Sequence, residues 1–591
     1  MKFLLAAVNA KYIHSNPAVY SLKAYAGAEC EKEIEIAEYT INNSMAYILS
    51  DIYRRKPDAA AFSCYIWNWR IVRELTEELH KVMPELPVWL GGPEVSFDAE
   101  EILTECGWIT GIMVGEGEET FRRLFHYYRT KTGGGGENYE RLEEIAGLVC
   151  RLGEGIARTG EREAADMDSL PFLYDQLENF RNRIIYYESS RGCPFRCSYC
   201  LSSVDKKVRF KNTETVKKEL QKLLDAKVAQ VKFVDRTFNC LPAHTAEIWK
   251  YIDAHDNGIT NFHFEIAADR MSAEELTILS QMRPGLVQLE IGVQSVNPYT
   301  LREINRDTDM EKLERIVAQI RSGRNVHVHL DLIAGLPYED YASFGRSFDR
   351  VYAMRPEQLQ LGFLKVLKGA PMHEKAESYG IRYASLPPYE VLCTRWLSYG
   401  EVCRLKRIEE MVELYYNSNQ FVHTLPVLEE SFAGPFALFE KLAEYYEENG
   451  YILNSPSRVY RYHIFLEFAL RYGKREEGLY KELLTYDIYL RENMKNRPGF
   501  ARDLSQYKEE FRDFYEREEG SREILPGYRG YSAKQTARMT HMEVFDYPVW
   551  ETVGNMDKLE KRKKVLFDYG ERNPLTKEAR TIVLEGGERK I

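Results

Sequence analysis

The 591-residue sequence lacks the features that mark membrane, secreted or nucleic-acid-binding proteins. No apolar run approaches the roughly 18–20 residues needed to span a bilayer. The apolar start, Met1–Asn9, is short for a secretory signal and has no cleavage site, so we predict a first β-strand there. The net charge of −11 gives no general attraction to nucleic acid or anionic membranes. We therefore expect no membrane partner, and a nucleic-acid partner is not indicated, although this net charge is compatible with a local basic patch.

The ten cysteines do not form a disulfide framework. Most are scattered along the chain, which is typical of proteins in a reducing compartment. We therefore expect a cytoplasmic protein. Three of them, Cys193, Cys197 and Cys200, form the pattern C-x-x-x-C-x-x-C. Three thiolates on one loop can hold three irons of a [4Fe-4S] cluster and leave the fourth iron free. The alternative is a zinc loop completed by a distant cysteine or histidine, because a structural zinc site needs four ligands.

Residues 1–130 alternate between strand-like and helix-like segments. The predicted strands are Phe3–Val8, Ile34–Tyr39, Ala59–Cys64, Val88–Leu90 and Ile112–Val114, and the predicted helices are Ala18–Ala28, Ser44–Arg55, Trp69–Val82, Asp98–Glu105 and Glu118–Arg129. This alternation predicts a parallel, doubly wound sheet with helices on both faces. Such sheets bind ligands beyond the carboxyl ends of their strands.

Glycine and polar residues gather at those strand ends. They are Asn9 to Asn16 after the first strand, Ser63 to Asn68 after the third, Gly91-Gly92-Pro93-Glu94 after the fourth and Gly115-Glu116-Gly117-Glu118 after the fifth. Glycines let the backbone approach a bulky ligand, although ordinary tight turns explain them as well. No G-x-G-x-x-G pattern follows the first strand, which disfavours a nicotinamide or flavin site.

Residues 131–183 are predicted to be a connector. Four consecutive glycines within Thr130–Glu137 predict a flexible linker, because they bury nothing and impose no conformation. The segments on either side of Gly153-Glu154-Gly155 predict a β-hairpin.

From residue 184 to 370 the alternation resumes. The predicted strands are Ile184–Ser190, Gln230–Val234, Phe262–Ile266, Leu286–Ile291, Val326–Ile333 and Gln358–Phe363, with a helix beginning near Thr213. Six such units predict a partial (β/α)6 barrel with its chemistry at the carboxyl ends of the strands. The cysteine loop follows the first of these strands, an order that a zinc loop does not require.

The cysteine loop at the head of six βα units resembles the radical S-adenosylmethionine (radical SAM) enzymes. In that family the free iron binds SAM, and the reduced cluster cleaves SAM to a 5′-deoxyadenosyl radical. Upstream, Asn9–Asn16, Gly91-Gly92-Pro93 and Val114–Glu118 resemble the amino-terminal domain of cobalamin-dependent radical SAM proteins. The resemblance implies a flavodoxin-like (Rossmann-like) cobalamin-binding domain, followed by the barrel, and three cofactors: a [4Fe-4S] cluster, SAM and cobalamin.

The resemblance also implies roles for individual residues. The cluster ligands are Cys193, Cys197 and Cys200, and the SAM contacts are Tyr199, Asp235, Glu265, Gln294, Ser295 and Gly335. Glu265 has an alternative role as the ion-pair partner of Arg270. Arg191 is expected to orient the sulfonium of SAM or to bond the cluster backbone, and Cys240 to be a buried structural thiol.

The implied cobalamin contacts lie at the strand ends of the first domain. They are Asn9, His14, Ser63, Tyr65, Trp67, Asn68, Gly91, Gly92, Pro93, Glu94, Gly115, Glu116 and Gly117. The Asp-x-His-x-x-Gly motif that supplies a cobalt ligand in many methylcobalamin enzymes is absent. We therefore favour cobalamin without a histidine ligand, with His14 in loop packing or in a hydrogen bond to the nucleotide tail.

Residues 371–591 have mainly helical patterns. Helices are predicted at Arg404–Tyr416, Phe432–Glu448, Tyr460–Arg471 and Lys508–Glu519, a small β element at Arg529–Tyr531 and Met542–Pro548, and a solvated charged helix at Lys558–Lys564. The resemblance implies that this extension covers the barrel mouth and helps to select the substrate.

Three functions are compatible with the sequence. The first is an enzyme that methylates an unactivated carbon of an unknown substrate, supplied with electrons by a donor such as flavodoxin or ferredoxin. The second uses the same cofactors for a rearrangement, cyclisation or oxidation without methyl transfer. The third is a non-catalytic cobalamin or cluster sensor, which the many SAM-facing strand ends disfavour.

Overall fold

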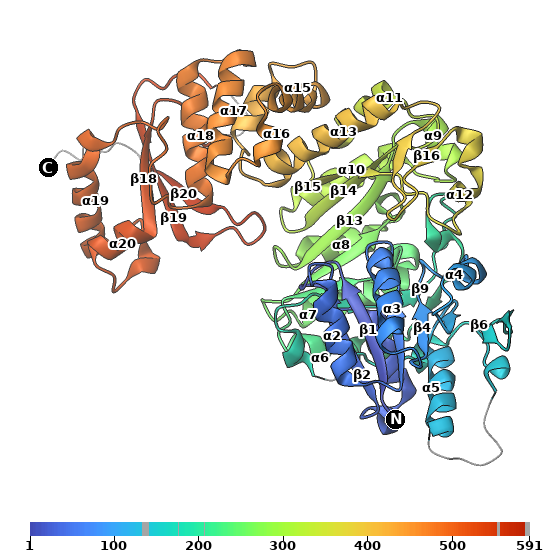
Figure 1. Ribbon diagram of the computed structural model, residues 1–591. Helices are drawn as coiled ribbons and strands as arrows, with labels where there is room; N and C mark the ends of the chain where they lie inside the picture. The colour runs from blue at the N-terminus through green and yellow to red at the C-terminus, as the bar shows by residue number, and fades with distance from the viewer. Residues whose placement is uncertain (133–140, 175, 206, 552–555, 585–591) are drawn as a thin grey trace.

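The structure, a computed structural model, describes residues 1–132, 141–174, 176–205, 207–551 and 556–584. Two α/β domains are followed by a helical region that ends in a small sheet (Figure 1). Within these ranges no helix has the length and apolarity that a membrane crossing requires. The predicted glycine linker, at 133–136, lies outside the described residues.

The first domain is built on a seven-stranded sheet with the order β2-β1-β3-β4-β5-β6-β7. Its strands are β1 (Phe3–Asn9), β2 (Ile34–Thr40), β3 (Ala59–Ser63), β4 (Val88–Gly91), β5 (Gly111–Met113), β6 (Leu148–Leu152) and β7 (Gly155–Arg158). Its helices are α1 (Pro17–Ala26), α2 (Met45–Arg55), α3 (Trp69–Val82), α4 (Ala99–Glu105) and α5 (Glu118–Thr132). The five predicted strands and five predicted helices of this domain are confirmed.

The residues of β1 show why the sheet is covered on both faces. Leu4, Ala6 and Val8 belong to one buried core, whereas Phe3 and Leu5 belong to another on the opposite side. Because neighbouring side chains of a strand point to opposite faces, a strand that is apolar throughout must be covered twice.

The predicted hairpin β6–β7 forms, but it extends the sheet of the first domain instead of lying in a separate connector. Strand β6 pairs antiparallel with β5, and Cys150 of β6 is opposite Gly111 of β5. A β-carbon at Gly111 would lie 2.4 Å from the Trp89 ring and 2.7 Å from the Cys150 side chain. The pairing depends on this close approach between distant residues, so the local pattern did not reveal it.

The second domain contains six parallel strands in the order β15-β14-β13-β12-β11-β8. They are β8 (Ile185–Tyr187), β11 (Gln230–Phe233), β12 (Asn261–Ile266), β13 (Val287–Gln294), β14 (His327–Ala334) and β15 (Gln358–Phe363). The helices between them are α6 (Thr213–Asp225), α7 (Pro242–Ala254), α8 (Ala273–Gln281), α9 (Pro298–Glu303), α10 (Met310–Ser322) and α11 (Tyr341–Tyr352). The predicted partial barrel is therefore confirmed.

Residues 364–397 cross the carboxyl ends of the barrel strands. They include α12 (Pro371–Lys375), β16 (Arg382–Tyr383) and β17 (Val391–Cys393). The backbone amide of Met372 donates to the carbonyl of Ser198 in the cysteine loop at 2.8 Å. Lys368 pairs with Asp98 of the first domain. This segment thus covers the junction between the two α/β domains.

The helical region comprises α13 (Tyr399–Val412), α14 (Thr424–Glu429), α15 (Pro435–Glu448), α16 (Tyr451–Asn454), α17 (Arg458–Tyr472) and α18 (Glu477–Arg491). It packs mainly on α11, through ring contacts of Phe348 with Phe436 and Phe439. Asn417 bonds the backbone of Leu359 near the start of β15. The expectation that the C-terminal region covers the barrel mouth is therefore correct only for its first part, up to residue 397. The helices that follow pack on α11 and near the start of β15, away from the mouth.

The chain ends with α19 (Lys508–Ser521), α20 (Ala533–Met539) and a three-stranded antiparallel sheet of β18 (Thr540–Phe545), β19 (Lys563–Arg572) and β20 (Ala579–Leu584). The predicted charged helix at Lys558–Lys564 is wrong. Lys563 and Lys564 begin β19 and pair with Phe545 and Val544 of β18. Pairing with β18 makes Lys563 and Lys564 part of a strand, because the apolar residues of β19 follow directly after these two lysines.

Candidate active site

The three cysteines lie on a loop that a short two-stranded ladder closes. Strand β9 (Ser190–Arg191) pairs antiparallel with β10 (Arg209–Phe210), so Arg191 lies opposite Arg209. Cys193 and Cys197 are buried, and Cys200 is partly exposed. At Gly192 the φ angle is +95°, and a β-carbon there would lie 2.6 Å from the carbonyl of Lys207. The loop can therefore turn at this point only with glycine.

Asp235, a predicted SAM contact, is instead bonded to the end of the cluster strand. Its carboxylate accepts from the Ser189 amide at 3.0 Å, the Ser189 hydroxyl at 2.6 Å and the Ser190 hydroxyl at 2.6 Å. Its side chain is buried, and burial raises its pKa. With both oxygens committed to these donors, Asp235 holds β11 to the cysteine loop. Its predicted bond to the SAM amino group is not supported.

Arg306 lies beside the cysteine loop and is a residue that the sequence reasoning missed. Its Nη1 is 3.7 Å from Cys197 Sγ and 3.4 Å from the Tyr199 hydroxyl, and its Nη2 donates to the Gly292 carbonyl. Burial raises the pKa of Cys197, and the positive charge of Arg306 opposes that rise. Arg306 follows α9 outside any motif, so no sequence signal pointed to it.

The predicted SAM contacts at the ends of β13 and β14 have different environments. Ser295 is buried and donates to Glu339 at 2.7 Å. Gly335 has a φ of +90°, and a β-carbon there would lie 2.7 Å from Val391 of residues 364–397, which we call the mouth segment. Gln294 has a φ of +71°, and its side-chain oxygen is buried without a hydrogen-bond partner among the described residues. Of these three residues, only Gln294 has an unused polar group.

Glu265 lies inside the barrel next to a group of paired charges. His263 is 2.9 Å and Lys232 is 3.1 Å from Glu290, the neighbour of Glu265 in the sheet register. Burial, together with the Glu290 charge, raises the pKa of Glu265 to about 7. Arg270, the alternative partner expected from the sequence, pairs with Asp307 at 2.9 Å. Glu265 therefore stays available for a ligand at the barrel mouth.

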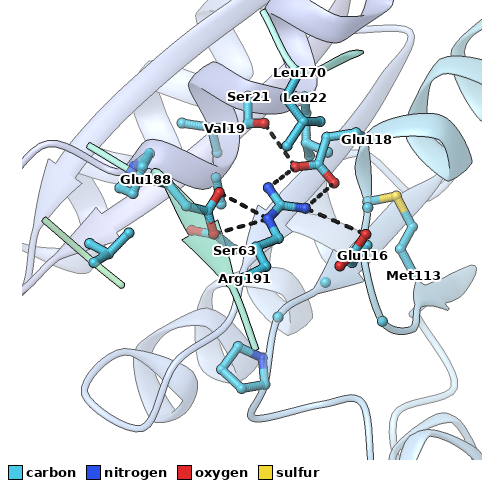
Figure 2. Close-up of a pocket in the computed structure, with 18 of the residues that line it drawn as sticks. Val19, Ser21, Leu22, Ser63, Met113, Glu116, Glu118, Leu170, Glu188 and Arg191 are labelled. Carbon is cyan, nitrogen blue, oxygen red and sulfur yellow. Dashed lines mark hydrogen bonds and ion pairs between the residues drawn. The ribbon is translucent and has the colours of Figure 1, made fainter. Parts of the chain in front are cut away.

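A cavity of about 860 Å³ lies between the two α/β domains, and we call it the interdomain cavity. On one side it reaches the core residues Leu5 and Met113 of the first sheet, and on the other it reaches Glu188 and Arg236 at the barrel strand ends. Eight of the predicted cobalamin contacts line it: Ser63, Tyr65, Gly91, Gly92, Pro93, Gly115, Glu116 and Gly117. Most of its wall is apolar, with a few charged groups such as Glu118 and Arg191 (Figure 2).

Asn9 and His14 do not line the interdomain cavity. His14 Nδ1 is 2.7 Å from the Tyr186 hydroxyl, and burial lowers the pKa of His14. Asn9 donates to the His14 carbonyl at 3.1 Å and to Glu38 at 2.8 Å. The loop after β1 is thus a contact between the domains, and of the two roles expected for His14, loop packing or a bond to the nucleotide tail, this geometry agrees with loop packing.

Three other predicted cobalamin contacts also lie outside the cavity wall. Asn68 is buried and donates to the Val8 and Ser63 carbonyls. Glu94 is buried and accepts a hydrogen bond from Tyr389. Trp67 is 45% exposed and stacks on Tyr65 with 4.3 Å between ring centroids. Asn68 and Glu94 therefore support the loops, while Trp67 packs on Tyr65, which lines the cavity.

Arg191 makes its side-chain hydrogen bonds with carboxylates of both α/β domains. Its Nε is 2.9 Å from both carboxylate oxygens of Glu188, and its Nη2 is 2.5 Å from Glu118 of the first domain (Figure 2). The two roles expected from the sequence stay predictions, and the side chain bridges the two domains.

Three family models match successive parts of the chain. Residues 4–125 match the B12 binding domain, residues 187–351 match the Radical SAM superfamily, and residues 377–567 match a protein family of unknown function, DUF4080. The first two cover the doubly wound sheet and the partial barrel described above. The chain belongs to the cobalamin-dependent radical SAM family.

Relatives of this radical SAM protein are distant. The cobalamin-dependent radical SAM methyltransferase TokK of Streptomyces tokunonensis is 23% identical over 346 residues, 55% of this chain and 50% of TokK. An anaerobic magnesium-protoporphyrin IX monomethyl ester cyclase of Cereibacter sphaeroides is 21% identical over 348 residues, 54% of this chain and 53% of the cyclase. The match thus spans about half the length of each relative.

A solved structure with the same fold extends over more of the chain. The cobalamin-dependent SAM radical enzyme OxsB aligns with a TM-score of 0.55 and 15% identity, covering 87% of this chain and 75% of OxsB. At this identity the likeness establishes the fold alone.

Membership of the family implies a [4Fe-4S] cluster, SAM and cobalamin, and the residues of this radical SAM protein fit these groups. Gly115 faces the interdomain cavity with a φ of +80°, and a β-carbon there would meet no atom of the described residues within 4 Å. The backbone there can therefore approach a bulky group. The cysteine loop offers three thiols, and at the end of β13 the side-chain oxygen of Gln294 has no hydrogen-bond partner among the described residues.

Proposed function

We propose that this protein uses a [4Fe-4S] cluster, SAM and cobalamin to methylate an unactivated carbon of a substrate. One observation carries the proposal: the interdomain cavity is walled by the predicted cobalamin loops and by residues next to the cysteine loop. Gly115 and Gly117 line it from the first domain, and Glu188 and Arg191 line it from the cluster side. A cofactor held there would face the barrel mouth.

The bound cofactors supply radical formation and methyl donation, while the chain supplies binding, orientation and exclusion of water. Cys193, Cys197 and Cys200 would hold the cluster. Arg306, within 3.7 Å of Cys197 Sγ, would stabilise the thiolate form that binds iron. Gln294, whose side-chain oxygen has no hydrogen-bond partner among the described residues, and Glu265, at the end of β12, would bond SAM.

The cobalamin loops would be held by contacts that do not touch the ligand. Asn68 and Glu94 fix the turns after β3 and β4, so Tyr65 and Gly91 to Pro93 can line the cavity. The substrate would enter beneath the mouth segment 364–397, and an electron donor such as flavodoxin or ferredoxin would reduce the cluster.

Methyl transfer is favoured over the alternative because of the relatives. Several of them are named methyltransferases or methylases, among them TokK and a hopanoid C-3 methylase of Methylococcus capsulatus. The second candidate is a cyclisation without methyl transfer. It is kept because one relative, from Cereibacter sphaeroides, is named a cyclase.

The test is anaerobic reconstitution with iron, sulfide and hydroxocobalamin, followed by incubation with SAM and reductant. We expect both 5′-deoxyadenosine and S-adenosylhomocysteine. 5′-Deoxyadenosine without S-adenosylhomocysteine would favour the cyclisation candidate. The absence of both products would contradict radical SAM activity.

A further inference from the structure

Arg191, next to the cysteine loop, binds a loop of the cobalamin domain. Its guanidinium donates to Glu118 at 2.5 and 3.3 Å and to Glu188 at 2.9 Å, and it lies 3.6 Å from Glu116 (Figure 2). Glu118 also accepts from Ser21 of α1 at 2.9 Å. Because Arg191 lies two residues before Cys193, this contact joins the first domain to the base of the cysteine loop.

Arg209 makes a second contact with the same loop. It lies opposite Arg191 in the β9–β10 ladder and donates to both oxygens of Glu116, one of them at 3.2 Å. It also donates to the Ala165 carbonyl at 2.7 Å, and the Ala165 amide donates to Glu116 at 2.8 Å. Both ends of the cysteine loop are therefore tied to the segment Gly115–Glu118.

These ion pairs are buried enough to have a defined geometry. The side chains of Arg191 and Glu118 are 16% and 7% exposed, and those of Arg209 and Glu116 are 12% and 23% exposed. Burial by itself would raise the pKa of Glu118, but the hydrogen bonds and charge of Arg191 outweigh it and lower that pKa. Planar guanidinium groups that bind carboxylates through two atoms fix orientation as well as distance.

The segment Gly115–Glu118 is also a wall of the interdomain cavity. Gly115, Glu116, Gly117 and Glu118 all line it, as does Arg191. A ligand bound against this segment would move with it, and the segment cannot move without displacing the two strands that carry the cysteine loop.

We propose that Arg191 and Arg209 are positioning residues that set the distance between bound cobalamin and the cluster. This inference rests on the proposed function, because it requires both cofactors. The competing explanation is that the two arginines only hold the domains together. Arg183 and Glu38 provide the comparison, since this pair joins the same two domains with side chains 16% and 8% exposed and does not contact the cavity segment.

The experiment compares Arg191→Ala, Arg191→Lys and Arg209→Ala with the control Arg183→Ala in reconstituted holoenzyme. Reduced protein contains two paramagnets, cob(II)alamin and the one-electron-reduced cluster, and pulsed EPR measures how strongly the cluster speeds relaxation of the cobalt spin. We expect this effect to change by about twofold or more in Arg191→Ala and Arg209→Ala, because the dipolar effect of the cluster on the cobalt spin falls steeply with distance and a lost two-atom contact would allow a displacement of about 1 Å. Arg191→Lys, which keeps charge but loses the planar fork, should lie between wild type and Arg191→Ala.

The outcomes separate the inference from the proposed function. An unchanged spin interaction in both alanine variants, with full cofactor content, would overturn the inference. An equal change in Arg183→Ala would also overturn it, because the distance between the cofactors would then depend on any ion pair that joins the two domains. If Arg191→Ala does not fold, Arg191→Lys decides, and a spin interaction identical to wild type overturns the inference. Wild-type protein that takes up neither cofactor would instead refute the proposed function.

Discussion

Ser189 and Asp235 join the first two strands of the barrel directly beneath the cysteine loop. Both the amide and the hydroxyl of Ser189 donate to the Asp235 carboxylate, at 3.0 and 2.6 Å. Neither side chain is more than 1% exposed. The base of the cysteine loop is thus fixed by a buried carboxylate from the neighbouring strand.

We predict that Asp235→Asn destabilises the cysteine loop. Asparagine would place an NH₂ group against one of the groups that now donate a hydrogen bond to Asp235. Such a buried mismatch of two donors costs about 1–3 kcal/mol. Thermal unfolding should shift downward, and iron per chain after reconstitution should fall. Asp253→Asn on α7 is the control, because that side chain makes no hydrogen bond among the described residues. Equal iron content in both variants would contradict the role of Asp235.

Cys197→Ala is expected to abolish cluster binding and SAM cleavage, since one of three iron ligands is removed. Cys240→Ala provides a sharper comparison. Cys240 is partly buried after β11, and it would be needed if the site used four cysteines. We expect Cys240→Ala to keep the iron and sulfide content of wild type, as should Cys403→Ala on α13. Loss of the cluster from Cys240→Ala would indicate a closed four-thiolate site with no free iron.

Gly115→Ala should weaken cobalamin binding more than it weakens folding. Its φ of +80° costs an alanine about 1–2 kcal/mol, and its added methyl group enters the interdomain cavity. Gly153→Ala, at φ +60° in the β6–β7 turn with nothing within 4 Å, carries a similar backbone cost away from the cavity. Thermal unfolding of the two apo variants should therefore agree, whereas optical titration with hydroxocobalamin should show weaker binding only for Gly115→Ala. Equal cobalamin affinity in the two variants would contradict the placement of the cofactor.

Glu265→Gln should change how stability depends on pH. The pKa of Glu265 is about 7 in the native protein and 4.5 ordinarily. The native state therefore keeps a proton that the unfolded chain releases, so this group's stabilisation is full below about pH 4.5 and is lost as pH rises to about 7. The melting temperature of Glu265→Gln minus that of wild type should increase between pH 5 and pH 8. The same difference at both pH values would show that Glu265 is ionised throughout.

Asp487→Ala should destabilise the helical region by about 2–3 kcal/mol, because three donors lose a buried acceptor. Asp487 of α18 accepts from the His423 amide at 3.0 Å, the Thr424 amide at 2.9 Å and the Thr424 hydroxyl at 2.6 Å. Asp487→Asn should cost less, since it keeps one acceptor. Limited proteolysis and thermal unfolding measure both, and equal stability of Asp487→Ala and wild type would refute this role.

The sequence by itself determined the two α/β domains and the cysteine loop. The sequence pattern located every strand from β1 to β5, because four of them are short apolar runs and β2 mixes apolar with polar residues between turns. The spacing of Cys193, Cys197 and Cys200 indicated a metal loop, since the ligands are local, and its place after the first of six βα units favoured a [4Fe-4S] cluster over zinc. The sequence also predicted eight residues of the cavity wall, because parallel strands bring their carboxyl ends to one edge of the sheet.

Only the tertiary structure decided how individual polar side chains are used. Asp235 and Asn68 occupy the predicted strand ends, yet their side chains bond neighbouring backbone and hydroxyl groups instead of facing a ligand. Arg306 reaches Cys197 from 109 residues away along the chain, and Arg191 reaches Glu118 from 73 residues away. Such partners are set by packing between distant elements, and a local sequence pattern carries no information about them. The same reason explains why α18, which is buried on most sides and shows no clear amphipathic period, was found only in the structure.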